Sequence, residues 1–408
     1  MSNLNLGALM KKFRLSKILI LAILIDAFLW YYLTLKVIAV VSSIFNVQQV
    51  ELLLLHSLGA LLGEIIGLFP KNRYKTLLLW VILGTTTAPL PFLVPTLLNF
   101  QSICFVWGFS FGFGIPASLA YFTENTSIEY RGRLSGIVLS TSFFCAAPLA
   151  GLAFLFGLQV LYTVFTVCRA IGFIPLFFLR NTFEKLKFDE DEETEKYVIL
   201  NMQGKLHLYF IPWLIFNLVD AFEGMLLTKF LKTTFSEHFA LLQITFLVLL
   251  GTFAFFGGFL CDAIGRKPVI ILGFTAIGMA YAIISVIPHS LAAWFLFAIC
   301  NGFSWGLFYT IFVFLIWGDI APKGFERKYY FIGTSPIFMA TFAQTFFAGY
   351  ILLLSETSAF SLAAIFLFLA VLPILFAPET LPEKTLKERE LRSYIEKAKR
   401  VREKFTKG

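Results

Sequence analysis

Long apolar segments alternate with short polar segments along the whole chain. A helix needs about 20 mostly apolar residues to cross the hydrocarbon core of a bilayer. The pattern therefore predicts twelve membrane-spanning helices, at approximately 18–41, 50–69, 76–98, 101–122, 134–156, 158–179, 206–230, 239–260, 269–287, 291–317, 329–353 and 359–377.

The composition favours the same class of protein. Hydrophobic residues make up 58% of the chain, charged residues make up only 14%, and phenylalanine alone occurs 50 times. A water-soluble domain cannot bury that much apolar surface, so we predict an all-α polytopic membrane protein. The loops are short, the histidines and cysteines show no metal-ligand spacing, and no ATP-binding motif appears. We therefore expect neither an enzyme nor a cofactor or bound metal.

The basic residues predict the orientation of the chain. With twelve spans both termini lie on one side, and segments on that side hold 29 of the 33 lysines and arginines. Basic loops favour the cytoplasm, so we expect both termini to be cytoplasmic in a plasma membrane. The anionic inner leaflet of the lipid bilayer then explains the net charge of +8, without a nucleic-acid partner.

One phrase occurs twice, at equivalent places in the two halves of the chain. Residues 24–28 read LIDAF and residues 218–222 read LVDAF, and LT follows each phrase at the same distance. The two phrases are 194 residues apart. A carboxylate inside a membrane span costs several kcal/mol and is functional by default. Asp26 and Asp220 are therefore predicted to face one pathway between two related halves.

Other features support two halves. A long polar interruption containing an acidic run predicts a cytoplasmic linker at 181–205. It would separate a six-helix bundle at 1–180 from a second at 206–377, followed by an amphipathic cytoplasmic tail at 378–408. In addition, two acids 195 residues apart each end a span and precede an arginine, namely Glu124 with Arg131 and Asp319 with Arg327.

The loop after the eighth predicted span carries the sequence GFLCDAIGRK at 258–267. Glycines permit close helix approach and a sharp reversal, and the basic pair fits a membrane surface. The pattern closely resembles the cytoplasmic loop signature of the major facilitator superfamily, and its defined positions include Gly258, Asp262, Gly265, Arg266 and Lys267. A P-E-T sequence at 378–380 is similar to the ending found in that family's sugar-porter and organic-ion branches.

The resemblance implies a fold of two six-helix bundles and a cytoplasmic gate. It implies that Asp262 faces the N-terminal end of the eleventh helix, where a carboxylate suits the helix dipole. It also implies that Arg266 pairs with Asp319, and that these contacts lock the cytoplasmic side while the outside is open. In the sister loop of the first half, Gly67 stands where the family has its aspartate.

Acids inside the spans are the candidates for proton coupling. Asp26 and Asp220 lie near the middle of the bilayer, and Asn217, Asp220 and Glu223 share one face of the seventh span. A buried carboxyl favours its neutral form, so we expect protonation at Asp26, Asp220 or Glu223 to be the coupling event. The alternative is that these acids only hydrogen-bond a neighbouring helix.

Aromatic and amide side chains in the spans are candidate cavity residues, with simple packing as the alternative. They are Trp30, Trp107, Asn301, Trp305, Tyr309 and Gln344. Arg169, also near mid-bilayer, either binds an anionic substrate or neutralises an acid such as Glu64 or Asp26, and pairing within the first half is the favoured reading. Glu64 is a candidate gate acid.

Taken together, the sequence predicts a monomeric secondary transporter that moves a small organic solute by alternating access, with proton symport as the leading mode. One alternative is proton-coupled efflux of drugs or metabolites, because APLAG at 147–151 resembles an element of the family's antiporters. A more remote alternative is a substrate sensor derived from a transporter.

Overall fold

The computed structural model describes residues 6–93, 96–180, 204–351 and 353–382, together with Lys387 and Leu391. Nearly all of the predicted linker at 181–205, and most of the predicted tail at 378–408, lie outside these residues. The described part of the chain is helical and contains no strand, which confirms the all-α prediction.

Each half contributes a series of helices. The first half contains α1 (Leu6–Ile44), α2 (Gln49–Gly67), α3 (Arg73–Thr87), α4 (Leu90–Leu93), α5 (Leu97–Glu124), α6 (Arg131–Phe156), α7 (Leu158–Ile171) and α8 (Phe173–Leu179). The second half contains α10 (His207–Thr234), α11 (Ser236–Ile264), α12 (Arg266–Val286), α13 (Leu291–Phe308), η1 (Tyr309–Leu315), α14 (Ile316–Ile320), α15 (Glu326–Ile351), α16 (Glu356–Leu369) and α17 (Val371–Phe376).

Within the described residues, eleven helical segments are long and apolar enough to cross a membrane, so the chain is a multi-pass membrane protein. The predicted span at 76–98 differs from the others. It falls on the 15-residue helix α3, the short helix α4 and the start of α5. Pro89 lies two residues after the end of α3, and a proline has no backbone N–H to continue a helix. The third segment is therefore broken where a continuous helix was predicted.

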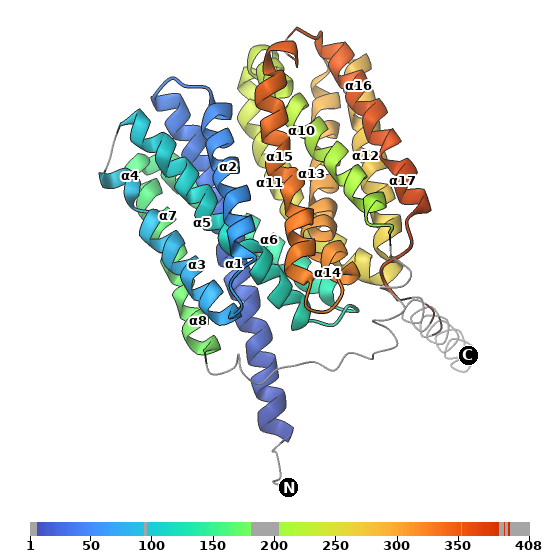
Figure 1. The fold of residues 1–408 in the computed structure, drawn as a ribbon. Coiled ribbons are helices and arrows are strands. Elements are labelled where there is room, and N and C mark those ends of the chain that lie inside the picture. The colour runs from blue at the N-terminus through green and yellow to red at the C-terminus, as the bar shows by residue number, and fades with distance from the viewer. Residues whose placement is uncertain are drawn as a thin grey trace, which may run out of the picture.

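The helices form two bundles with matching internal packing, as Figure 1 shows. In the first bundle α2 packs on α5, α1 on α6, and α3 on α5. In the second bundle α11 packs on α13, α10 on α15, and α12 on α13. Taken in the order given, each pair of the first bundle has its counterpart at the same place in the second bundle. A duplication of six segments would produce this correspondence.

Glycines allow the closest of these helix pairs to form. A Cβ atom at Gly63 or Gly112 would collide with the backbone of the facing helix in the α2–α5 pair. Gly306 meets the backbone of α11 in the same way. Lipid tails are as apolar as the side chains, so helix association in a membrane depends on such close packing.

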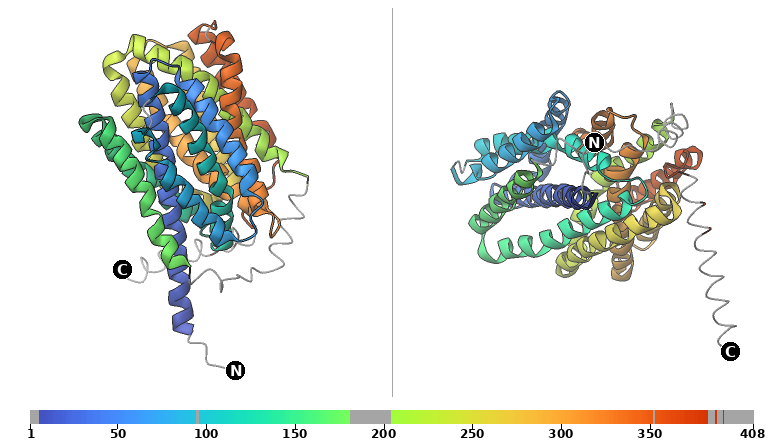
Figure 2. Two further views of the ribbon diagram at one scale, coloured as in Figure 1. Left: turned by 60° about the vertical axis from the view of Figure 1, so that its left-hand side comes forward. Right: turned by 90° about the horizontal axis from the view of Figure 1, so that it is seen from below.

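The two bundles meet along two seams. α6 packs on α11, and α2 packs on α15. α1 begins and α17 ends on the same side of the molecule, the lower side in Figure 1, and this side is called the near side below. In the view from the near side in Figure 2, the two bundles lie side by side.

The tenth segment changes its helical form in the middle. Between α13 and α14 the chain follows the π-helix η1, which begins at Tyr309. The indole N–H of Trp317 donates to the backbone oxygen of Phe312 at 2.5 Å, so it satisfies one carbonyl of this irregular turn. Segments of π-helix are frequent at functional sites, and η1 follows α13 in the chain and contributes its first residue, Tyr309, to the cavity described below.

Candidate functional site

A cavity of about 490 Å³ lies between the two bundles. Its walls come from α1, α2 and α6 of the first half and from α10, α11, α13, η1 and α15 of the second half. The lining residues belong to the middle parts of these helices and to the parts away from the near side. The cavity therefore occupies the centre and the far half of the molecule.

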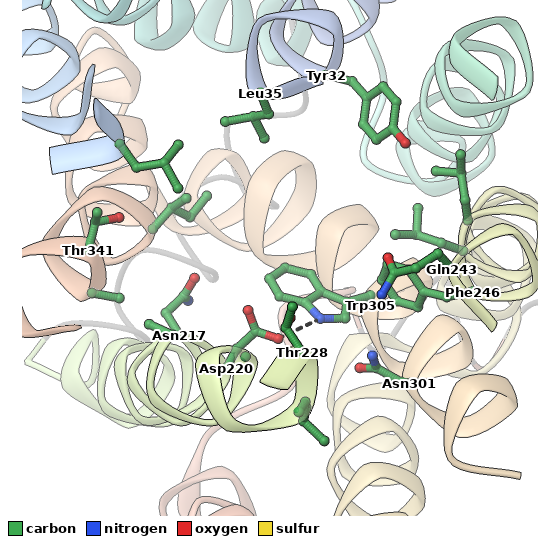
Figure 3. Close-up of a pocket in the computed structure, with 18 of the residues that line it drawn as sticks. Tyr32, Leu35, Asn217, Asp220, Thr228, Gln243, Phe246, Asn301, Trp305 and Thr341 are labelled. Carbon is green, nitrogen blue, oxygen red and sulfur yellow. Dashed lines mark hydrogen bonds between the residues drawn. The ribbon is translucent and has the colours of Figure 1, made fainter. Parts of the chain in front are cut away.

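Asp220 is the acid among the cavity-lining residues (Figure 3). The indole N–H of Trp305 donates to one of its carboxylate oxygens at 3.1 Å, and the other oxygen points into the cavity. The side-chain amide of Asn217, one turn earlier on α10, donates to the backbone oxygen of Trp213 at 2.7 Å. On α15, the amide of Gln344 donates to the backbone oxygen of Ala221 at 2.5 Å.

Glu223 belongs to the same helix but is not one of the lining residues. Its residue surface is 6% exposed, and one carboxylate oxygen is buried without a hydrogen-bond partner among the described residues. The face predicted for Asn217, Asp220 and Glu223 is therefore divided. Asn217 and Asp220 reach the cavity, whereas Glu223 is buried outside it.

Asp26 lies in a different environment from Asp220. Its carboxylate accepts a hydrogen bond from the guanidinium of Arg169 at 2.6 Å, and Arg169 is fully buried. The guanidinium also lies 4.9 Å from the ring centre of Trp30 and 4.6 Å from that of Trp80, and it donates to the backbone oxygen of Trp80 at 3.2 Å. Glycines at 84 and 172 leave room for the pair, because a Cβ at either position would collide with it.

The repeated phrase predicted that Asp26 and Asp220 face one pathway. The structure places them in separate environments. Asp26 is not among the cavity-lining residues and is neutralised within the first bundle. Pairing of Arg169 within the first half, the favoured sequence reading, is what the structure contains.

The predicted cavity residues also divide by half. Asn301, Trp305, Tyr309 and Gln344, all in the second half, line the cavity. Trp30 stacks on Phe165, and Trp107 donates its indole N–H to the backbone oxygen of Thr87 at 2.9 Å. Both tryptophans are fully buried in the first bundle, so packing is their role there.

Sequence reasoning missed several lining residues on α1 and α11. Tyr31, Lys36 and Gln243 contribute to the walls. Tyr31 directly follows Trp30 and therefore lies on a different face of α1. The sequence reading assigned the face of Asp26 and Trp30 to the cavity, whereas the face of Tyr31 lines it. Gln243 stands alone in an apolar stretch of α11, and an isolated amide in a span was the available signal.

The near side of the cavity is closed by a buried ion network. Asp319 of α14 forms an ion pair with Arg131 of α6, across the two halves. It also accepts from Nε of Arg266 at 3.1 Å, the pair that the family resemblance implied, and from the hydroxyl of Thr380 at 3.3 Å. The Asp319 side chain is fully excluded from solvent.

Asp262 has a different partner from the one that the resemblance implied. Its two carboxylate oxygens accept from the backbone N–H groups of Gly132 at 3.0 Å and Arg133 at 2.9 Å. These groups form the N-terminal end of α6, the fifth segment, so the expectation of the eleventh helix was wrong. The reason is that α11 packs on α6 across the halves. The expected chemistry, a carboxylate at a helix N-terminus, is present.

Gly258 is needed for this approach, because a Cβ there would collide with the backbone oxygen of Gly132. The seam between α6 and α11 is consequently held by direct backbone contact and by the Asp262 carboxylate.

Glu379, in the P-E-T ending, caps the N-terminus of α12. Its carboxylate accepts from the backbone N–H of Arg266 at 2.8 Å and of Lys267 at 3.0 Å. Gly265, which precedes them, has a φ of 97°, and a Cβ there would collide with the Glu379 side chain. The Lys267 ammonium donates to the backbone oxygen of Leu375 at 2.7 Å. These contacts fix the loop signature within the second half.

The second seam has its own polar contacts on the near side. The carboxylate of Glu64 on α2 accepts from the hydroxyl of Thr334 on α15 at 2.5 Å, and Glu64 is fully buried. Arg327 donates to the backbone oxygen of Pro70 at 2.5 Å, also across the halves. Glu124, by contrast, pairs with Arg73 inside the first half.

The chain resembles solved structures of other proteins in its fold. No protein-family model matches the sequence, and neither does any curated protein. A proton:xylose symporter of the major facilitator superfamily, XylE, bound to 6-bromo-6-deoxy-D-glucose, matches with a TM-score of 0.67 at 15% identity, over 90% of this chain and 96% of that chain. The human organic anion transporter MFSD10 matches with a TM-score of 0.68 at 12% identity, over 89% of this chain and 99% of that chain. The chain therefore has the major facilitator fold.

Proposed function

We propose that this chain is a secondary active transporter of the major facilitator superfamily, which moves a small organic solute by alternating access and is coupled to protons. One observation carries the proposal. A cavity bearing an acid, Asp220, lies between two bundles, and the opposite, near side of the same interface is closed by contacts of Asp319 and Asp262 across the halves.

This arrangement supports a two-state cycle. The solute enters from the far side and contacts α10, α13 and α15. The bundles then rock about the cavity, so that the ion pair of Arg131 with Asp319 and the helix-capping contact of Asp262 are exchanged for water. Substrate sites in transporters built from repeats lie at the repeat interface near the bilayer midplane.

Asp220 and Glu223 are the acids that we assign to proton coupling. An ionised carboxylate taken into a low-dielectric, closed cavity is strongly penalised, and protonation removes the charge. Glu223 already has one enclosed oxygen without a partner among the described residues. Asp26 does not share this role, because Arg169 neutralises it.

The distribution of basic residues supports a cytoplasmic near side, so the cavity would belong to an outward-facing state in the plasma membrane. Both bundles belong to one chain and together enclose the cavity, so we propose that the monomer transports.

Symport is the leading coupling mode, and exchange is the second candidate. Exchange is favoured by one observation: Asp220 is the single acid among the lining residues of the cavity. A proton and a solute that both require this carboxylate would exclude each other, and they would move in opposite directions.

Flux in proteoliposomes tests the proposal. Labelled D-xylose, L-lactate, L-leucine and tetraphenylphosphonium represent four solute classes. We expect a pH gradient to drive accumulation of a solute in one class, and a protonophore to abolish it. Accumulation on the alkaline side indicates symport, and accumulation on the acidic side indicates exchange.

The matched variant is Asp220→Asn, which keeps the shape of the side chain but cannot ionise. We expect it to retain downhill movement and lose the response to the gradient. Undiminished gradient-driven flux in this variant would remove Asp220 from coupling. Rates equal to those of protein-free liposomes for all four solutes would reject transport itself.

A further inference from the structure

The wall of the cavity on α10 and α15 presents hydrogen-bond acceptors. The amide nitrogens of Asn217 and Gln344 donate to the backbone oxygens of Trp213 and Ala221. A backbone oxygen can only accept, so each side chain must direct its nitrogen to the helix and keep its own oxygen for another partner. Within the described part of the chain, no hydrogen bond reaches either of these side-chain oxygens.

The carboxylate of Asp220 lies on the same wall. Trp305 donates to one oxygen, and no basic side chain pairs with Asp220 among the described residues. Lys36 and His56 are the basic residues of the cavity lining. The Lys36 ammonium lies over the ring of Tyr32, at 5.1 Å from the ring centre, and the imidazole of His56 packs edge-on against the ring of Tyr31. Asp220, Asn217 and Gln344 thus form an acceptor cluster with an uncompensated negative charge.

Aromatic rings lie beside this cluster, and one of them, Trp305, is the hydrogen-bond donor to Asp220. Trp305 and Tyr309 are in contact with each other, with ring centres 4.8 Å apart, and both line the cavity. Phe246 of α11 adds a third ring to the wall. Aromatic faces attract cations, most strongly when the site excludes water.

We propose that the cavity binds an organic ammonium, a protonated primary or secondary amine carried on an aromatic body. The ammonium donates N–H groups to the acceptor cluster, and the body packs against Trp305 and Tyr309. This inference rests on the proposed function, because it names the substrate class of the same cavity. A cation that needs the ionised Asp220 carboxylate corresponds to the exchange mode of that function, the second candidate above.

Charge decides between an amine and a neutral polyol. A neutral hydroxyl could donate to the same oxygens, but it would leave the Asp220 charge enclosed and uncompensated. An ammonium offsets that charge, and charge-assisted hydrogen bonds are roughly twice as strong as neutral ones. An anion would face the carboxylate and the two amide oxygens without a donor of its own.

Three phenols of nearly equal size test the proposal, namely tyramine, which is a cation at neutral pH, neutral tyrosol and anionic 4-hydroxyphenylacetate. Binding to the purified full-length chain is measured by calorimetry and by thermal stabilisation at one pH and one ionic strength. We expect tyramine to bind about tenfold or more tightly than tyrosol, and 4-hydroxyphenylacetate to bind most weakly.

Two variants locate the effect. Asp220→Asn should reduce tyramine affinity to about that of tyrosol, so that the preference for the cation is lost. An unchanged melting temperature of the ligand-free variant shows that it is folded. Lys36→Gln removes the other charge of the cavity lining and serves as the matched control. It should keep the preference for tyramine.

The proposal is overturned if tyrosol or 4-hydroxyphenylacetate binds as well as tyramine, if none of the three binds, or if Asp220→Asn keeps the preference. These outcomes are separable from failure of the proposed function. A chain that binds no phenol but accumulates D-xylose under a pH gradient remains a transporter with another substrate. A chain that binds tyramine through Asp220 but moves no solute has the site without the transport.

Discussion

Two aspartates at equivalent positions of the repeats have opposite surroundings. Asp26 meets the guanidinium of Arg169, whereas Asp220 meets only the indole N–H of Trp305 and the cavity. The position 194 residues after Arg169 is Ala363, so the second half has no equivalent cation. The near-identical phrases predicted an acid inside a helix of each half, and of these Asp26 is buried while Asp220 lines the cavity. They could not predict the difference, because the partner of Asp26 lies on another helix and far away in the sequence.

Removing the arginine should be costly. Arg169→Leu leaves the Asp26 carboxylate buried without a partner, and we expect a loss of about 3–5 kcal/mol in the free energy of unfolding. Thermal melting of the purified protein in detergent measures the loss. The double variant Asp26→Asn with Arg169→Leu should recover much of it, because no charge is left to bury. Equal melting of the single and double variants would show that the pair contributes no coupling energy.

At the scale of the elements, bulky residues fill the first bundle where small or polar residues open the second. Trp30 and Trp107 are packed inside the first half. The residues 194 positions later are Gly224 and Asn301, and both line the cavity. The close-packing glycines, by contrast, are shared, since Gly302 and Gly306 stand 194 positions after Gly108 and Gly112. The helices are thus assembled in the same way in both halves, and only the side chains at the centre differ.

Restoring the bulk should close the cavity. A Cβ at Gly224 meets no atom within 4 Å, so Gly224→Trp can be accommodated and should occupy the space beside Asp220. The measurement is the rate at which a membrane-impermeant thiol reagent modifies Asn301→Cys, in a chain whose five native cysteines are replaced by alanine. We expect strong slowing with Gly224→Trp.

The matched control is Gly349→Trp, because Gly349 also has open space around it but lies outside the cavity lining. It should leave the modification rate unchanged. If both tryptophan variants react at the parental rate, the thiol is not reached through the cavity.

The helices themselves could largely be predicted from the sequence. Apolar segments of sufficient length located the spans, and the prolines from Pro89 onward mark the break in the third segment. The partner of Asp262 was not predictable from the loop signature alone. It depends on α11 packing against α6, a contact between the two halves that no local pattern encodes.

At the scale of the whole molecule, the near-side closure depends on few polar groups. Asp319 forms ion pairs both with Arg131 of the first half and with Arg266 of the second half. Truncating one partner of a buried charge pair costs about 2–5 kcal/mol. Each 1.4 kcal/mol changes an equilibrium about tenfold, so loss of this single carboxylate is large enough to change the balance between the closed and open near side.

Asp319→Asn should therefore open the near side. Spin labels at Ser127 and Lys323, in near-side loops of different halves, report the separation of the bundles by pulsed electron resonance. We expect a new population at longer distance. Glu124→Gln is the control, because Glu124 pairs within the first half, and it should leave the distance distribution unchanged. An unchanged distribution in Asp319→Asn would mean that the closure does not depend on this network.

The guanidinium enclosed by two tryptophans has a consequence for how such a chain could acquire new specificities. With its own acid neutralised and its centre filled, the first repeat serves as a fixed scaffold, and recognition is left to its sister copy. Changes of ligand preference should then accumulate on α10, α13 and α15, while the opposite bundle tolerates few exchanges at its centre. After duplication, one repeat would in this way provide rigidity and the other selectivity.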